Sequence, residues 1–269
     1  MPKKSTIPSS ASLPFIWRLA DSIFPRPDNL AGATNSLRPV GKGFFVTIST
    51  ILFDAGDILY NKPKRKSAVI EFLSSRGYSA PMENDPIEKA KRLEAHAGKI
   101  ETPAFFEWLM AHYGVDNAQD AADGIKILKE QQSAVQFFPN VPETLHELKR
   151  RGFKLGIVTN TFNSQEEKTR WFKTVGIDDI WDSYADSFVL QITKPDPRIY
   201  MAAIDPLNVK PENSIFVGHA QTELDGAKSV GMTTVMFNPD ASCTVADFKA
   251  KDFSDLLRVP PIAEARLVG

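Results

Sequence analysis

Four polar clusters in the sequence contain the residue types that phosphate chemistry requires. Asp54 follows a β-branched and aromatic run and precedes a turn with glycine. Further along come the pair Thr159 and Asn160, then Lys194 before Pro-Asp-Pro, and finally an acidic segment with Glu223. A carboxylate exposed at a strand end can attack phosphorus and form an aspartyl-phosphate. The hydroxyl and the amide can bind phosphoryl oxygens, and the ammonium can neutralise the nucleophile and the phosphate.

The segments that carry these clusters predict an α/β fold. The strand candidates are short and almost continuously apolar, as strands covered on both faces are. They lie at residues 44–53, 154–159, 214–217 and 233–237. Helical patterns separate them, and Asp196 before Pro197 is a typical helix start. The alternation predicts a Rossmann-like, doubly wound parallel sheet, in which ligands bind beyond the carboxyl ends of the strands.

A long helical segment interrupts this alternation. Residues 61–138 contain three apolar stripes at helical spacing and no convincing strand. We therefore expect a helical cap domain at 61–138, inserted into a core domain formed by 44–60 and 139–269. Such an insert lies above the strand ends and is a natural lid. Residues 1–43 are rich in Ser and Pro and are expected to form a flexible leader.

Composition excludes several other classes of protein. The 269 residues are 42% apolar with a net charge of −1, which gives no global bias toward nucleic acid or a membrane surface. No apolar stretch approaches the length that spans a bilayer. The N-terminus is interrupted by Pro14, Arg18 and Asp21 and is a poor signal peptide. One cysteine, Cys243, excludes a disulfide framework, so we expect a cytoplasmic protein. The sequence carries no signal for oligomeric state.

The four clusters, in this order, resemble the four motifs of the haloacid-dehalogenase-like superfamily. The specific elements are Phe53-Asp54 before a glycine turn, residues 194–200, and residues 226–232, which close the fourth motif. The helical insert resembles that of the subgroup with a cap between motifs one and two. The resemblance implies Asp54 as nucleophile and Lys194 as charge clamp. It also implies phosphate binding by Thr159 and Asn160, and Mg²⁺ bound by Asp54, the backbone oxygen of Gly56 and Glu223.

The sequence departs from the phosphatases of that superfamily at two positions. They carry a second Asp, the general acid/base, two residues after the nucleophile, where this chain has Gly56. Asp57, one place later, is a doubtful substitute, and loss of the group costs about 10²–10⁴-fold in rate. Ala220 follows Gly218-His219 where the metal-binding Asp of the fourth motif is expected. Imidazole is a poor ligand for Mg²⁺ because that ion prefers oxygen.

These features leave three functions open. The first is a Mg²⁺-dependent phosphatase of a small phosphorylated metabolite. The second is a weak or inactive family member that binds a phosphorylated ligand or a protein partner, which the departures at Gly56 and Ala220 favour. The third is a 2-haloacid dehalogenase that uses the same Asp54, since that reaction needs neither the second Asp nor a metal. The basic run at 62–66 is either a solvated linker or an element that steers anionic substrates.

Overall fold

A computed structural model describes residues 48–63, 66–79, 82 and 84–265. The predicted leader, residues 1–43, lies outside the described residues, as do the first residues of the strand predicted at 44–53. Within the described part, that strand begins at Thr50.

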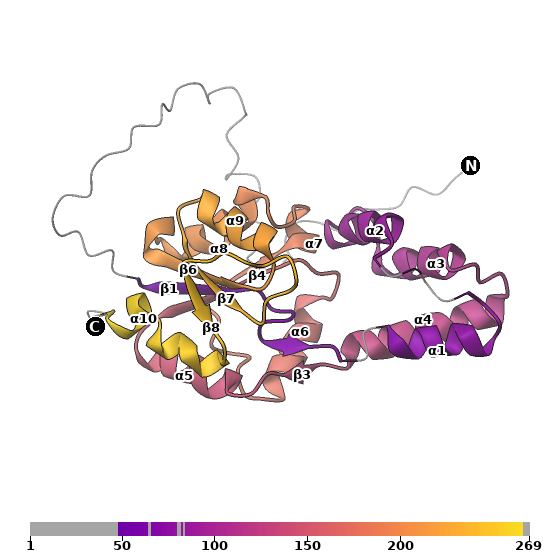
Figure 1. The fold of residues 1–269 in the computed structure, drawn as a ribbon, viewed down its shortest axis with the longest axis horizontal. Coiled ribbons are helices and arrows are strands. Elements are labelled where there is room, and N and C mark those ends of the chain that lie inside the picture. Colours follow the sequence, from indigo (N-terminus) through magenta and orange to yellow (C-terminus); the bar gives the residue numbers. More distant parts are fainter. Residues whose placement is uncertain (1–47, 64–65, 80–81, 83, 266–269) are drawn as a thin grey trace, which may run out of the picture. The chain divides into compact units, whose positions relative to one another are not determined.

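A six-stranded parallel sheet forms the core of the molecule, as predicted (Figure 1). Its strands, in spatial order, are β5 (Ser183–Asp186), β4 (Lys154–Thr159), β1 (Thr50–Phe53), β6 (Ser214–Gly218), β7 (Thr233–Phe237) and β8 (Phe248–Ala250). In the register, Phe53 of β1 lies opposite Ile157 of β4 and Val217 of β6. The residues that follow these three strands therefore meet at one edge of the sheet.

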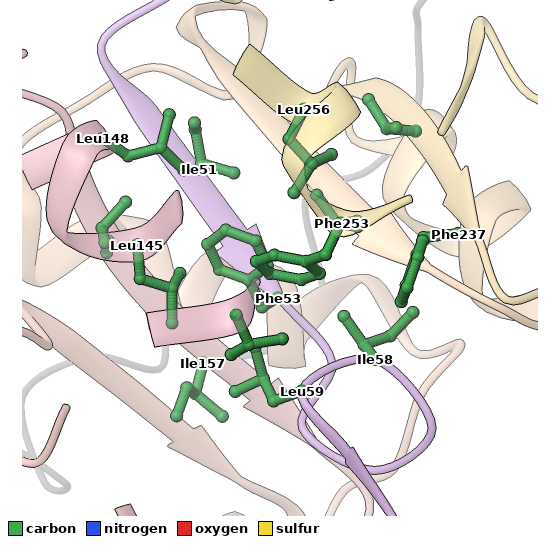
Figure 2. Packing of buried hydrophobic residues seen from close by; sticks show 14 of the residues in the cluster. Ile51, Phe53, Ile58, Leu59, Leu145, Leu148, Ile157, Phe237, Phe253 and Leu256 are labelled. Carbon is green, nitrogen blue, oxygen red and sulfur yellow. The ribbon is translucent and has the colours of Figure 1, made fainter. Parts of the chain in front are cut away.

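Helices cover both faces of the sheet. They are α5 (Val141–Arg150), α6 (Gln165–Lys173), α7 (Ser187–Leu190), α8 (Pro197–Ile204), α9 (Gln221–Ser229) and α10 (Pro260–Ala263), with 3₁₀ turns at Asp205–Leu207, Pro211–Asn213 and Phe253–Arg258. On one face, Ile51 and Phe53 pack against α5 and the turn at Phe253 (Figure 2). Leu52 points to the other face, where it meets the buried side of α8. Because successive residues face opposite layers, β1 is buried on both sides.

The insert between β1 and β4 is mainly helical. It contains α1 (Ser67–Ser75), α2 (Pro86–His96), α3 (Thr102–His112) and α4 (Ala118–Ser133). Helix α4 packs against α1 and α3, and α2 packs against α3, around a separate apolar cluster. No helix in the described ranges is both long and apolar enough to cross a membrane.

The expectation of no strand in this region was wrong. Two short strands, β2 (Tyr60–Asn61) and β3 (Gln136–Phe137), pair in antiparallel fashion where the chain enters and leaves the insert. Two residues are too few to produce an alternating pattern that sequence periodicity can detect. The boundaries of a separate cap domain at 61–138 remain a prediction.

Candidate active site

Asp54 lies at the carboxyl end of the central strand. Its backbone N–H donates to the carbonyl of Val217 at 3.0 Å, which continues the pairing of β1 with β6 for one more residue. The side chain is only 6% exposed, and its Oδ1 accepts a hydrogen bond from the N–H of Ala55 at 2.7 Å. The hydrogen bonds with Val217 and Ala55 thus hold Asp54 at the carboxyl end of β1.

Lys194 reaches this carboxylate from the loop that follows α7. Its Nζ lies 2.8 Å from Oδ1 of Asp54 and 3.0 Å from Oε1 of Glu223. The lysine side chain is fully buried, so solvent screens these ion pairs very little. The structure therefore brings together three residues that the sequence analysis selected from separate motifs.

Asn160 holds the backbone of Lys194. Its Oδ1 accepts from the Lys194 N–H at 2.8 Å, and its Nδ2 donates to the Lys194 carbonyl at 3.3 Å. Both ends of the amide are engaged in this contact, so Asn160 positions the lysine. Phosphate binding by Asn160 remains a prediction, whereas this positioning contact was not foreseen from the sequence.

Helix α9 positions Glu223 by approaching the lysine loop closely. A side chain at Gly226 would put its Cβ 2.8 Å from both the Pro195 carbonyl and the Tyr200 hydroxyl, so only glycine fits. The same Tyr200 hydroxyl donates to the Glu223 carbonyl at 2.7 Å. The close packing of α9 against the loop thus keeps Glu223 within reach of Lys194.

The environment pushes the pKa values of the two carboxyls apart. Burial opposes ionisation of Asp54, but the nearby Lys194 and then His219 outweigh it and hold its pKa well below the usual range. Burial raises the pKa of Glu223, and the charge of Asp54 adds to this effect although Lys194 opposes it. Asp54 is therefore ionised at neutral pH, as a nucleophilic carboxylate must be.

His219, which precedes the position where the sequence predicted a metal-binding Asp, lies beside Asp54. Its Nε2 lies 3.5 Å from Oδ2 of Asp54. Burial lowers the pKa of His219, but its hydrogen bond to Asp54 and the two nearby carboxylates raise it overall. Ala220 instead lies at the N-cap of α9. His219, one place before Ala220, is thus the residue of the fourth motif that lies beside Asp54, and the replacement of the motif's Asp by Ala220 stays a prediction.

The turn after Asp54 leaves space at Gly56, where the family's second Asp was expected. A Cβ added to Gly56 would meet no atom within 4 Å, and Gly56 lines the cavity described below. Asp57 has a left-handed backbone with φ of 61°, and its carbonyl accepts from Nδ2 of Asn238 at 2.8 Å. Asp57 also lines the cavity, so its predicted acid/base role remains a prediction.

Lys168 is a second buried ammonium near the site, and the sequence analysis missed it. It lies on α6, is 1% exposed, and its Nζ donates to the Thr159 hydroxyl at 3.0 Å. Burial lowers the pKa of Lys168 to about 8, although Asp186 and Asp54 oppose this shift. No pattern in the sequence predicts this contact, because a lysine in a polar helix is ordinarily exposed.

One cavity of about 400 Å³ unites these groups. Its floor carries Asp54, Gly56, Thr159, Asn160 and Glu223, with Lys194 buried beneath. Residues from the helical insert and the segment before it also line this space, namely Lys62, Lys66, Arg92, His96 and Gln132. The volume suits a small metabolite.

The floor of the cavity also offers ligands for a divalent cation. Asp54, His219 and Glu223 each present one ligand atom, and these atoms lie within 4.8 Å of one another. Among the described residues, Oε2 of Glu223 is buried and has no hydrogen-bond partner. Two carboxylates and an imidazole fit a divalent ion, and the imidazole favours Mn²⁺, Co²⁺ or Zn²⁺ over Mg²⁺.

Comparisons with known proteins agree with this arrangement. Residues 85–237 match the family model described as haloacid dehalogenase-like hydrolase. Over more than half of its length, the chain thus carries the pattern of that family. It belongs to the haloacid dehalogenase-like hydrolases, as the order of the four motifs predicted.

The individual relatives are only distantly similar to this chain in sequence. A glyceraldehyde 3-phosphate phosphatase of Pyrococcus furiosus is 27% identical over 81% of this chain and 92% of its own. An (S)-2-haloacid dehalogenase 4A of Burkholderia cepacia is 32% identical, but over only 47% of this chain and 52% of its own. The crystal structure of a predicted phosphoglycolate phosphatase from Haemophilus somnus superposes with a TM-score of 0.58. It has 18% identity and covers 81% of this chain and 100% of its own, which supports the fold.

Proposed function

We propose that this hydrolase is a phosphatase that cleaves small phosphate monoesters through an aspartyl-phosphate on Asp54. The observation that carries the proposal is the ionised Asp54 at the cavity floor, 2.8 Å from the buried ammonium of Lys194. The relatives named as phosphatases, one of which aligns over 92% of its length, support the same reaction. The helical insert would serve as the lid of the site.

The proposed reaction has two steps. An oxygen of Asp54 attacks phosphorus, the P–O bond to the leaving group breaks, and the departing alkoxide takes a proton from solvent water. Water then attacks the acyl-phosphate and gives one proton back to solvent, which releases inorganic phosphate and restores the Asp54 carboxylate. Lys194 neutralises charge on the nucleophile throughout, and Thr159 with Lys168 stabilises the phosphoryl oxygens.

A divalent cation would be held by Asp54, Glu223 and His219, with the backbone oxygen of Gly56 as the further ligand that the family resemblance implies. When bound, it would reduce the repulsion between carboxylate and phosphate. The ion is expected to be Mg²⁺ in the family, but here His219 changes the donor set. The two buried carboxylates remain available because Lys194 neutralises only one of their charges.

The first expected result concerns the ion. Phosphatase activity should be lost in EDTA and restored more effectively by Mn²⁺ or Co²⁺ than by Mg²⁺ at equal concentration, because imidazole is a better ligand for these ions. His219→Asp should reverse the order by at least about 10-fold, since a third carboxylate suits Mg²⁺. Calorimetric titration of each ion measures the same preference without turnover. An unchanged ion order in the variant would remove His219 from the metal site.

A second expected result concerns Lys168. Lys168→Met should weaken binding of inorganic phosphate by about 10-fold, because a charge-assisted hydrogen bond is lost. The same change should raise the unfolding midpoint by roughly 5 °C at pH 7, since it removes a buried charge. Its folded pKa near 8 is below the unfolded value, so the stability gain should shrink as pH rises from 8 toward 10.5. Weaker binding without added stability would point to a packing defect instead.

A direct assay separates the proposed function from its rivals. The purified chain is incubated with p-nitrophenyl phosphate and with 2-chloropropionate, and released phosphate and chloride are measured with and without metal. Metal-dependent phosphate release supports the phosphatase. Metal-independent chloride release would establish the dehalogenase, for which Gly56 and the relative from Burkholderia cepacia argue. No turnover, with stabilisation by vanadate, would establish a binding protein.

A further inference from the structure

Several basic side chains line the cavity. Lys62, Lys66 and Arg92 line it from the helical insert and the segment before it, and Lys168 lines it from the core, beside Thr159. Lys62 donates to the amide oxygens of Gln132 at 2.7 Å and Asn163 at 3.0 Å. These contacts fix the direction of the ammonium without changing its charge.

Lys66 and Arg92 share one buried carboxylate. Both contact the same oxygen, Oε1 of Glu88, at 2.7 Å and 2.5 Å. The other oxygen of Glu88 accepts from the Tyr113 hydroxyl at 2.8 Å, and the carboxylate is 4% exposed. Among the residues that the structure describes, these two cations thus share a single carboxylate, and both line the cavity, so one of their two positive charges is available to a ligand.

The state of His96 reflects this positive potential. Burial is the main cause that lowers its pKa, to about 3, and the charges of Arg92, Lys168, Lys194 and Lys62 lower it further. The ring packs against Phe162 in a tilted arrangement, with centroids 5.1 Å apart, and both residues line the cavity. A neutral imidazole at neutral pH can both donate and accept hydrogen bonds, which a bound anion and its hydroxyl groups can use.

A lone phosphate would not use these charges fully. Its phosphoryl group would lie over Asp54, where Lys168, Lys194 and Thr159 surround it. Lys66 and Arg92 line the same cavity but pair with Glu88, whereas Lys194 pairs with Asp54 and Glu223. Glu88 compensates only one of the two charges on these partly exposed side chains, which favours a ligand that brings a second negative group to them.

We propose that Lys66 and Arg92 form a second anion subsite, so that the preferred substrates are phosphate monoesters with a further anionic group, a carboxylate or another phosphate. The planar guanidinium of Arg92 suits bidentate contact with either group. The inference rests on the proposed function in one respect, which is that the scissile phosphate lies over Asp54.

The test measures binding without turnover. Asp54→Asn in the full chain is titrated by calorimetry with 2-phosphoglycolate and with ethyl phosphate, which differ by a carboxylate in place of a methyl group. A parallel pair, propane-1,3-diol bisphosphate and propyl phosphate, tests a second phosphate. In at least one pair, the ester with the second anionic group should bind about 10–100-fold more tightly than its partner, as expected for a hydrogen-bonded charge pair. The pair with the larger ratio identifies the second group.

Variants assign the preference to the subsite. Arg92→Gln or Lys66→Gln should reduce the ratio to about threefold or less, whereas Glu88→Gln should increase it, because that change frees both cations. If these residues only maintained the fold, their substitution and that of Glu88 would not change the binding ratio in opposite directions. Lys89→Gln, at an exposed position on α2, is the matched control and should leave the ratio unchanged.

The outcomes separate this inference from the proposed function. Equal binding within both pairs, or a ratio that Arg92→Gln and Lys66→Gln leave unchanged, would overturn the second subsite. A clear difference in affinity within one pair, together with no phosphate release by the unmutated chain, would support the subsite and overturn the phosphatase. Absence of binding by every ester would overturn both.

Discussion

Asp54→Asn should abolish phosphate release, with a loss on the order of 10⁴-fold or more. An amide of the same shape cannot form the acyl-phosphate, and nucleophile removal in hydrolases leaves only the contribution of binding and electrostatics. Initial rates with p-nitrophenyl phosphate at saturating metal measure this directly. Vanadate and phosphate should still bind, because Lys194, Thr159 and Lys168 remain and a carboxylate that repels the anion is gone.

Glu223→Gln is the matched control for this variant. It also removes a carboxylate that contacts Lys194, at 3.0 Å, but leaves the nucleophile in place. Its loss of activity should be recovered in part by higher metal concentration, whereas that of Asp54→Asn should not. Equal, metal-independent losses in the two variants would mean that Asp54 only maintains the charge cluster, and that another group attacks the substrate.

Much of the arrangement around Asp54 was predictable from the sequence, because most of the motifs directly follow recognisable strands and parallel strands end on the same side of the sheet. The nearly continuous apolar runs at 154–159 and 233–237 match β4 and β7 residue for residue. Parallel pairing then places Asp54 and Thr159 at neighbouring strand ends. The contact between Asp54 and Lys194 was expected for the same reason, although the catalytic roles of these residues remain predictions.

Other features depend on tertiary contacts that a linear pattern does not contain. Strands β5 and β8 were missed because their sequences, Ser-Tyr-Ala-Asp and Phe-Lys-Ala, are short and partly polar. Lys168 resembles a surface residue until the packing of α6 buries it against Thr159. The shared carboxylate of Glu88 likewise joins two cations, one before α1 and one on α2, whose proximity depends on how the insert folds.

Under the proposed function, the two departures from the family would act on different steps. His219 would change the ligands available to a cation and therefore the charge neutralisation in both steps. Gly56 would remove a proton donor for the leaving group and for the attack of water. The contacts of Lys194 with Asp54 and of Lys168 with Thr159 involve neither residue. A slow phosphatase and a binding protein would therefore share the same cavity and differ in proton transfer.

Gly56→Asp should raise the turnover of alkyl phosphates by about 10²-fold, the lower end of what general acid–base catalysis contributes. The backbone permits the change, because Gly56 is not among the residues with positive φ and an added Cβ meets no atom within 4 Å. Alkoxide leaving groups need a proton, whereas p-nitrophenolate hardly does, so the gain should be much smaller for p-nitrophenyl phosphate. Rates for both ester types across pH 5–9 measure this difference.

Gly56→Asn separates proton transfer from simple filling of the turn. It has nearly the shape of the Asp variant but no titratable proton, so it should leave the rate on alkyl phosphates near that of the parent chain. Asp57→Asn answers the complementary question, since a loss of about 10²-fold there would show that Asp57 already acts as the acid/base. If Gly56→Asp turns over alkyl phosphates no faster than Gly56→Asn, and Asp57→Asn keeps the rate of the parent chain, proton transfer does not limit this enzyme.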